Sequence, residues 1–312
     1  MRDDTAHPEE AEAVGRGRLE GRFRHFLAID WSGAAGERHR GIALALAVAE
    51  GGPPVLIDPG RGWSREEVLA LLRDDLPRDT LVGLDLGISL PFVDCGAFFP
   101  ELGNGPDDAR ALWAMIDEVS SGDPHLGAGS FVDHPAFAPY FRRHGGREGA
   151  HFRCDGAAHG RGRFRVTEHA QAVQGCKPYS NFNLIGAAQV GKSSLTGMRV
   201  LHRLRGHLPV WPVDPLPASG SVLIEIYTSL AALEAARRPS TSKMRSYEAL
   251  NGALAALGSP GIGGSGPIDD HTSDALLAAA WLREVAHDPA RWRPRGLTPE
   301  IARTEGWTFG AL

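Results

Sequence analysis

The 312-residue chain has few cysteines, no long apolar run and no excess of positive charge, and each shortage excludes a class of protein. Three cysteines, Cys95, Cys154 and Cys176, are too few and too scattered for a disulfide framework, which favours a reducing cytoplasm. No window is apolar for the length of a membrane span, so no membrane partner is expected. The net charge of −5 excludes a globally basic nucleic-acid-binding protein and leaves local basic patches open.

The composition, 42% hydrophobic and 23% charged, is that of an ordinary globular protein. Residues 1–22 contain acidic residues and lack the apolar core of a secretion signal, so we expect a mobile N-terminal tail. Residues 23–290 are expected to form one domain. Residues 291–312 form a C-terminal extension whose Trp307 and Phe309 either pack on the domain edge or cap the active site.

The first hundred residues contain strand and helix patterns in an informative order. Apolar stretches predict strands at 26–30, 42–48 and 53–60, joined by short turns as in an antiparallel meander. Ser64 and Glu67 have the spacing of a capping box and predict a helix over 63–76. The next apolar run, over 81–90, predicts a fourth strand.

The second half predicts an α/β architecture with a large inserted segment over about 92–178, which has one helical pattern around 107–119. After this segment come a helix following Lys192, a strand over 221–227, a helix near 243–257 and a strongly patterned helix over 269–287. The whole predicts a mixed five-stranded sheet flanked by helices.

Residues 186–193 read GAAQVGKS and match the phosphate-loop pattern G-x-x-x-x-G-K-[ST]. In that pattern Lys192 would reach the outer phosphates of a nucleotide and Ser193 would hold magnesium. A helix follows the motif, but the preceding PYSNFNLI lacks the branched apolar run of a buried parallel strand. A phosphate loop from Gly186 to Ser193 therefore stays one hypothesis.

The inserted segment contains two further candidate features. Its arginines outnumber its acidic residues between Phe141 and Arg165, and this pattern is typical of phosphate-backbone contact and of a solvated loop alike. HFRCDGAAH places His151, Cys154 and His159 close together, and Cys176 could add a fourth zinc ligand, although the spacing matches no standard zinc motif.

Carboxylates stand at unusual places in the apolar strands. Asp30 ends FLAID, Asp85 lies in VGLDLG, and Glu225 lies in VLIEIY. An unpaired charge in such surroundings costs several kcal/mol, so these residues are expected to be paired or bound to metal. Asp270 and Asp274 lie four residues apart on the last helix, with His271 between them. Each has a structural alternative, as a helix cap, a turn residue or an ion-pair partner, but together they favour a divalent-cation site.

Six motifs resemble, in the same order, those of the predicted ribonuclease H-fold nucleases, the domain of unknown function family numbered 429. They are FLAIDWSGA, VGLDLGISLPF, TEHAQ, QVGKSSLTGM, EIYTSL and DHTSDALLAAAWLR, and they run from about Phe26 to Val285. The resemblance implies a ribonuclease H-like fold, whose metal site lies where the first and fourth strands meet the last helix. It also suggests that Lys192 completes the phosphate-loop pattern by chance.

The resemblance implies the residues of a nuclease site, with Mg²⁺ or Mn²⁺ as cofactor and nucleic acid as partner. Asp30, Asp85 and Asp274 are the implied metal ligands, Asp270 and Glu225 are further candidates, and His271 would move protons. Lys192, Ser193, Ser194 and Arg165 would contact the phosphate backbone. The implied reaction is two-metal hydrolysis of phosphodiester bonds.

Three other functions stay open. An actin-like ATP site would use the turn at Asp30, Ser32 and Gly33, although that class duplicates the fold and this chain shows one copy. An NTPase would use the phosphate loop. A non-catalytic nucleic-acid-binding module would use the arginine-rich segment.

Overall fold

The structure, a computed structural model, describes residues 19–154, 162–185, 189–236 and 243–312. In these ranges six strands form one mixed sheet, in the order β3-β2-β1-β4-β6-β5. The strands are β1 (His25–Asp30), β2 (Ala43–Val48), β3 (Val55–Ile57), β4 (Thr80–Asp85), β5 (Val210–Trp211) and β6 (Val222–Glu225). No helix in this part of the chain is long and apolar enough to cross a membrane.

The pairing of the strands is mixed. β2 runs antiparallel to both β1 and β3, whereas β1, β4, β6 and β5 run parallel to one another. The α/β class and the flanked mixed sheet are therefore confirmed. The expected number of five strands was one too low, because β5 is only two residues long and gives no sequence pattern of its own.

Helices connect the strands and follow them. They are α2 (Arg65–Ala70), continued by a wider turn over Leu71–Asp75, α3 (Ala109–Val119), α4 (Gly129–Asp133), α5 (Val166–Val173), α6 (Val190–Arg203), α7 (Thr228–Glu234), α8 (Tyr247–Ala256), α9 (Asp270–Val285), α10 (Pro289–Trp292) and α11 (Pro299–Thr304). Single 3₁₀ turns occupy Pro124–Leu126, Ala138–Tyr140 and His144–Gly146. The predicted capping box is present, because Ser64 Oγ accepts from Glu67 N–H at 3.1 Å and Glu67 Oε2 accepts from Ser64 N–H at 3.0 Å.

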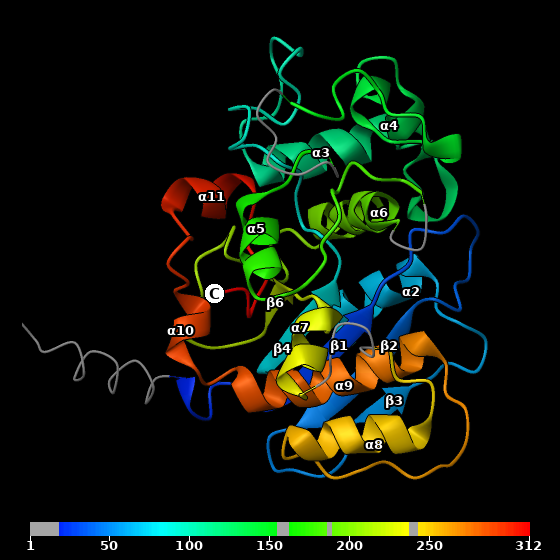
Figure 1. Ribbon diagram of the computed structural model, residues 1–312, viewed down its shortest axis with the longest axis vertical. Helices are drawn as coiled ribbons and strands as arrows, with labels where there is room; N and C mark the ends of the chain where they lie inside the picture. The colour runs from blue at the N-terminus through cyan, green and yellow to red at the C-terminus, as the bar shows by residue number, and fades with distance from the viewer. Residues whose placement is uncertain (1–18, 155–161, 186–188, 237–242) are drawn as a thin grey trace, which may run out of the picture.

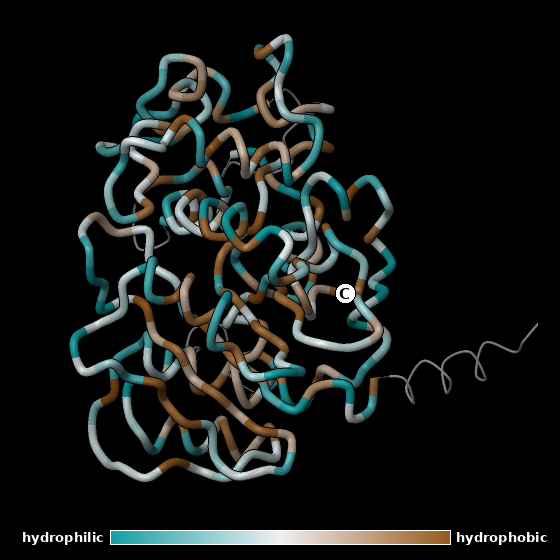
Figure 2. Tube along the Cα trace, turned by 180° about the vertical axis from the view of Figure 1, so that it is seen from behind, coloured by the Kyte–Doolittle hydropathy of each residue, from teal (hydrophilic) through white to brown (hydrophobic). Residues whose placement is uncertain are grey.

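Two hydrophobic cores lie on opposite faces of the sheet. Phe26 and Ala28 of β1 belong to the core that contains α7, α8 and α9, whereas Leu27 and Ile29 belong to the core that contains α2, α3 and α6. Figure 1 shows α9 lying along the strands with α7 and α8 beside it, and α3, α4 and α6 grouped apart from them. In Figure 2 the hydrophobic stretches run through the middle of the molecule and the hydrophilic ones concentrate in outer loops. The strands therefore alternate between two packed layers.

The start of α5 and the C-terminal residues pack near the end of β6, where Arg165 and Thr308 contact Glu225. Within residues 92–178 the structure has α3, α4 and α5, of which only α3 was expected. Trp307 and Phe309 are buried, and Phe309 N–H donates to Glu225 O at 2.9 Å. These two aromatic side chains pack in the core that contains α9. The predicted mobile tail falls mostly on residues 1–18, outside the described residues.

Gly83 lets α9 and the chain after β6 approach the middle of β4. A Cβ at this position would lie 2.8 Å from both Ile226 Cγ2 and Leu282 Cδ1. We expect Gly83→Ala to lower the free energy of unfolding by about 1–3 kcal/mol, the usual cost of overpacking a core. Urea denaturation measures this change.

Gly252→Ala is the matched control, because a Cβ there meets no atom within 4 Å and the residue lies inside α8. Replacing a helical glycine with alanine should stabilise the protein by about 0.5–1 kcal/mol. A Gly83→Ala protein as stable as the wild type would contradict the close packing of α9 on β4.

Candidate metal centre

Two carboxylates lie side by side at the carboxyl ends of neighbouring strands. Asp30 ends β1 and Asp85 ends β4, and these two residues are partners in the parallel register. Register partners point to the same face of a sheet. Because Ala28 and Leu81 lie in the core with α9, Asp30 and Asp85, two and four residues further along their strands, face α9 as well.

The first two turns of α9 bring two more functional side chains to this face. Asp269 caps the helix by accepting from Thr272 N–H at 2.9 Å, which fixes where the helix begins. His271 Nδ1 lies 2.7 Å from Asp30 Oδ2, and Asp274 Oδ2 accepts from Lys243 Nζ at 2.6 Å. The structure therefore places Asp30, Asp85, Asp274 and His271 near one another.

Burial and neighbouring charges raise the pKa of two of these carboxyl groups, Asp85 and Asp274. Burial raises the pKa of Asp85 well above its ordinary value, the charge of Asp30 adds to this, and a 2.9 Å hydrogen bond from Thr228 Oγ1 opposes it. Burial also raises the pKa of Asp274 to about 6, with Lys243 opposing and Asp30 adding. A hydrogen bond to Asp30 raises the pKa of His271. The group offers several carboxylate oxygens at one place, which is the donor set that a hard divalent cation prefers.

Lys243 is the positive charge that the sequence analysis missed. Burial alone would lower its pKa, but Asp274, Asp270 and Asp30 together raise it. Its side chain is 53% exposed and reaches the site from the segment before α8. A single lysine outside any motif gives no pattern. Thr228 could have been noticed, because it lies three residues after β6 and begins α7, near the edge where the parallel strands end.

The carboxylate oxygens are spread more widely than a bound cation would hold them. In the described part of the chain, the only His, Cys, Asp or Glu trio whose ligand atoms all lie within 4.8 Å is Asp94, Cys95 and Cys154. Repulsion between carboxylates and the pairing of Asp274 with Lys243 are consistent with this spacing. Asp270 lies at the rim, with Oδ1 at 3.5 Å from Arg245 Nε. A cation at this site would have to draw the ligands inward or bind some of them through water.

Glu225 lies on the opposite face of the sheet and is not part of this group. It is the register partner of Leu84, which belongs to the other core, so it points away from Asp85. Both its carboxylate oxygens accept from Arg165, at 2.8 and 2.6 Å, and Oε2 accepts from Ile88 N–H. The predicted catalytic role of Glu225 is therefore not supported, and the alternative of an arginine partner is what the structure shows.

Arg165 is a core residue, which contradicts its predicted contact with a phosphate backbone. Its side chain is 1% exposed, and Glu168 and Glu225 take its donors together with the carbonyl oxygen of Glu305. Arg163 is equally buried, and it binds Asp94 and three carbonyl oxygens. The arginine-rich segment therefore supplies fewer surface charges than its composition indicated.

The predicted phosphate-contacting residues at the start of α6 fall into two groups. Ser194 is buried and its Oγ accepts from Gly87 N–H at 3.2 Å, so its role is structural. Lys192 is exposed and lines a cleft of about 800 Å³ together with Gly33, Arg143 and Arg147. Gly33 touches the start of α6, because a Cβ there would lie 2.3 Å from the carbonyl carbon of Lys192. Ser193, half-buried, follows Lys192 in this first turn.

The structure gives the phosphate-loop pattern little support. α6 begins at Val190, inside the motif, and residues 178–185 form no strand. A phosphate loop requires a strand directly before it. Gly186 itself lies outside the described residues.

The predicted zinc ligands are not brought together. Cys176 is buried in the core with α9, whereas Cys154 lies near Asp94 and Cys95, and His151 packs on Tyr140. Burial raises the pKa of Cys95 to about 12. His159 lies outside the described residues.

Comparison of the chain with protein-family models, curated proteins and solved structures gives no match. The function must therefore be argued from the arrangement of its side chains.

The position of Glu225 predicts a structural role that stability measurements can test. Glu225→Gln leaves the buried Arg165 without full compensation, so the free energy of unfolding should fall by about 3–5 kcal/mol. Glu148→Gln, which breaks an exposed pair with Arg153, should cost about 1 kcal/mol or less. If Glu225→Gln is as stable as the wild type but no longer binds Mn²⁺, Glu225 belongs to the cation site after all.

The raised pKa of Asp85 predicts that its charge destabilises the fold. A carboxyl whose pKa is raised in the folded state binds its proton more tightly there, so the stability is lowered as the pH rises through that pKa. Asp85→Asn keeps an acceptor for Thr228 and removes the charge. In a metal chelator and at neutral pH, this variant should unfold at a higher temperature than the wild type, by about 1–2 kcal/mol in stability.

The advantage of Asp85→Asn should shrink as the pH is lowered from about 8 to about 5, because the wild-type carboxyl then becomes neutral too. Thermal unfolding across this range measures it. A variant that is less stable than the wild type at all pH values would contradict the clustering of uncompensated carboxylates.

Proposed function

We propose that this protein is a metal-dependent nuclease that hydrolyses phosphodiester bonds of nucleic acid, with Mg²⁺ or Mn²⁺ held by Asp30, Asp85 and Asp274. One observation carries the proposal: two strand-end carboxylates that are register partners face a third carboxylate on α9. Oxygen ligands of this kind from two strands and a helix are what these hard cations prefer.

The sheet supports a ribonuclease H-like fold as part of the proposal. Three strands in antiparallel succession, a helix, and a fourth strand parallel to the first are the order that the sequence resemblance implies. The late helix α9 packs on β1 and β2, with Asp274 toward the strand ends. Because a fold hosts many activities, the side chains carry more weight than the topology.

The residues at the site divide the chemical tasks among them. Two bound cations would supply an activated water and a counter-charge for the leaving oxygen. Asp30 would hold a cation together with Asp85, its register partner, and it is hydrogen-bonded to His271. His271 is half-exposed and hydrogen-bonded to Asp30, so it would exchange protons between the site and solvent. Lys243 would release Asp274 to the metal and turn toward a phosphate oxygen.

A cleft that begins at the turn after β1 supports a phosphate-bearing substrate, although Asp30, Asp85 and Asp274 do not line it. Gly33, three residues after Asp30, forms its wall next to Lys192, and Arg143 and Arg147 line it further along. Asp133 also lines the cleft but is paired with Arg143 at 2.7 Å. Of the four residues predicted to contact the nucleic-acid backbone, Lys192 and Ser193 are the ones that we still propose, because Ser194 and Arg165 are buried.

A second candidate is ATP binding, because the same cleft joins the Ser32–Gly33 turn to Lys192. An actin-like site and a phosphate loop would both use this cleft for phosphate groups. Tight ATP binding that Lys192→Ala abolishes would favour the phosphate loop. ATP binding that Asp30→Asn abolishes and Lys192→Ala leaves intact would favour an actin-like site.

The proposal predicts Mn²⁺-dependent cleavage that fails when one ligand is neutralised. Asp30→Asn and Asp274→Asn should each lower cleavage by more than the roughly 10–100-fold that follows loss of an outer-shell partner. Labelled single-stranded and duplex DNA and RNA are the substrates. Glu284→Gln is the matched control, because it removes the same charge from an exposed position on α9, ten residues beyond Asp274.

Calorimetric titration of Mn²⁺ separates the cation site from the choice of substrate. Binding to the wild type that disappears in Asp85→Asn supports the site even where no tested substrate is cut. Unchanged cleavage by Asp30→Asn would overturn the two-metal assignment. Salt-sensitive nucleic-acid binding without cleavage, indifferent to all three carboxylates, would identify a binding module instead.

A further inference from the structure

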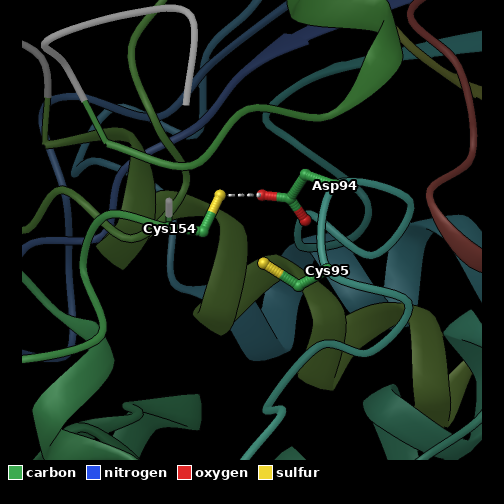
Figure 3. Close-up of side chains that lie close together, drawn as sticks. All are labelled: Asp94, Cys95 and Cys154. Atoms are coloured by element: carbon green, nitrogen blue, oxygen red, sulfur yellow. Dashed lines mark hydrogen bonds between the residues drawn. The ribbon is translucent and has the colours of Figure 1, made fainter. Parts of the chain in front are cut away.

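A second group of ligand-type side chains lies in the inserted segment, away from the carboxylates. Asp94 and Cys95 belong to the loop after β4, and Cys154 approaches them from 60 residues beyond Asp94. Their ligand atoms all lie within 4.8 Å of one another. Figure 3 shows the three side chains pointing toward a common point.

The spacing of this group suits a tetrahedral cation. Cys154 Sγ lies 3.6 Å from Asp94 Oδ2. A zinc ion with Zn–S of about 2.3 Å and Zn–O of about 2.0 Å would hold sulfur and oxygen ligands about 3.5 Å apart at the tetrahedral angle. The two ligands therefore stand at nearly the separation that binding requires.

Arg163 holds one side of the group in place. It donates to both carboxylate oxygens of Asp94, at 2.8 and 2.6 Å, and to the carbonyl oxygens of Pro91, Ala97 and Phe98. These bonds fix the loop on both sides of Cys95. Asp94 can still bind a cation, because an ionised carboxylate has about four lone-pair positions and Arg163 takes two of them.

The charges also balance. Two thiolates and the Asp94 carboxylate carry three negative charges, which a divalent cation and the Arg163 guanidinium together offset. Without the cation, two neutral thiols and the Asp94–Arg163 ion pair are again neutral. The group thus carries no net charge with or without the cation. The partial burial of its two cysteines therefore disfavours neither the metal-free nor the metal-bound state.

We propose that Asp94, Cys95 and Cys154 form a zinc-binding site, with a fourth position that a water molecule or an external ligand takes. As the two Zn–S bonds form, both thiols release their protons to solvent, and no atom changes its oxidation state. Sulfur ligands select zinc over Mg²⁺ and Mn²⁺. The site is therefore distinct from the carboxylate centre and does not depend on the proposed nuclease function.

The test is titration of Zn²⁺ into the reduced, metal-free protein in competition with a chromophoric chelator. We expect one equivalent of zinc to bind, and Cys154→Ser and Cys95→Ser each to lose that binding. Co²⁺ in place of zinc should give a thiolate-to-metal charge-transfer band that the same variants lack. Cys176→Ser, which removes a thiol from the other core, should keep both signals.

Several outcomes would overturn the assignment. No uptake of zinc by the wild type, or equal zinc binding by the wild type and both serine variants, would show that these cysteines are not ligands. A reduced protein that ignores zinc but forms a Cys95–Cys154 disulfide in air would identify a redox pair instead. Circular dichroism establishes that each variant is folded, and zinc binding retained by Asp85→Asn separates this site from the carboxylate centre.

Discussion

The in-register parallel pairing of β1 with β4 is the constraint on which the candidate site depends. It places Asp30 beside Asp85 at the ends of two apolar strands, where burial and the charge of Asp30 disfavour the charge of Asp85. A slip of one residue would turn either carboxylate to the other face of the sheet. The register is held by the two hydrophobic cores, since the alternating side chains of β1 fill one core with α9 and the other with α6. The packing of the two cores thus stabilises a strand register that the buried charge of Asp85 opposes.

The sheet also separates two sets of acidic residues with opposite roles. On the face away from α9, Glu225 and Glu168 both bind the buried Arg165, and Thr308 donates to Glu225. This network joins β6, α5 and the C-terminal residues, and its carboxylates have no lone pairs to spare for a cation. On the α9 face, the carboxylates share one partly exposed lysine and a histidine. The same residue type is structural where its charge is matched, and a candidate ligand where it is not.

Sequence patterns predicted the parts of this arrangement that depend on local order. The first four strands, the capping box at Ser64 and the approach of α9 to Asp30 follow from periodicity and from the resemblance. The face of Glu225 could not be predicted, because all four residues of β6 are buried and the strand lacks the polar alternation that reveals a face. Arg165 and Cys154 have their partners about 60 residues away, and Lys243 stands in a segment without a pattern. The roles of these residues become visible only in their tertiary contacts.

The two candidate cation sites follow from different chemistry in one chain. The carboxylate centre offers only oxygen, its ligands are spread apart, and Lys243 supplies the counter-charge on Asp274, so a metal must compete with an ammonium group for the same oxygen. Such competition favours modest affinity and ready exchange, as suits ions that arrive with a phosphate substrate. The Asp94 group offers sulfur, its ligands stand close together, and Arg163 contacts the far side of the carboxylate without blocking it. A cation there displaces only protons, which favours tight and lasting binding. The difference in counter-ion, a partly exposed lysine against a buried arginine, therefore leads us to expect weaker binding at the proposed carboxylate site than at the proposed zinc site.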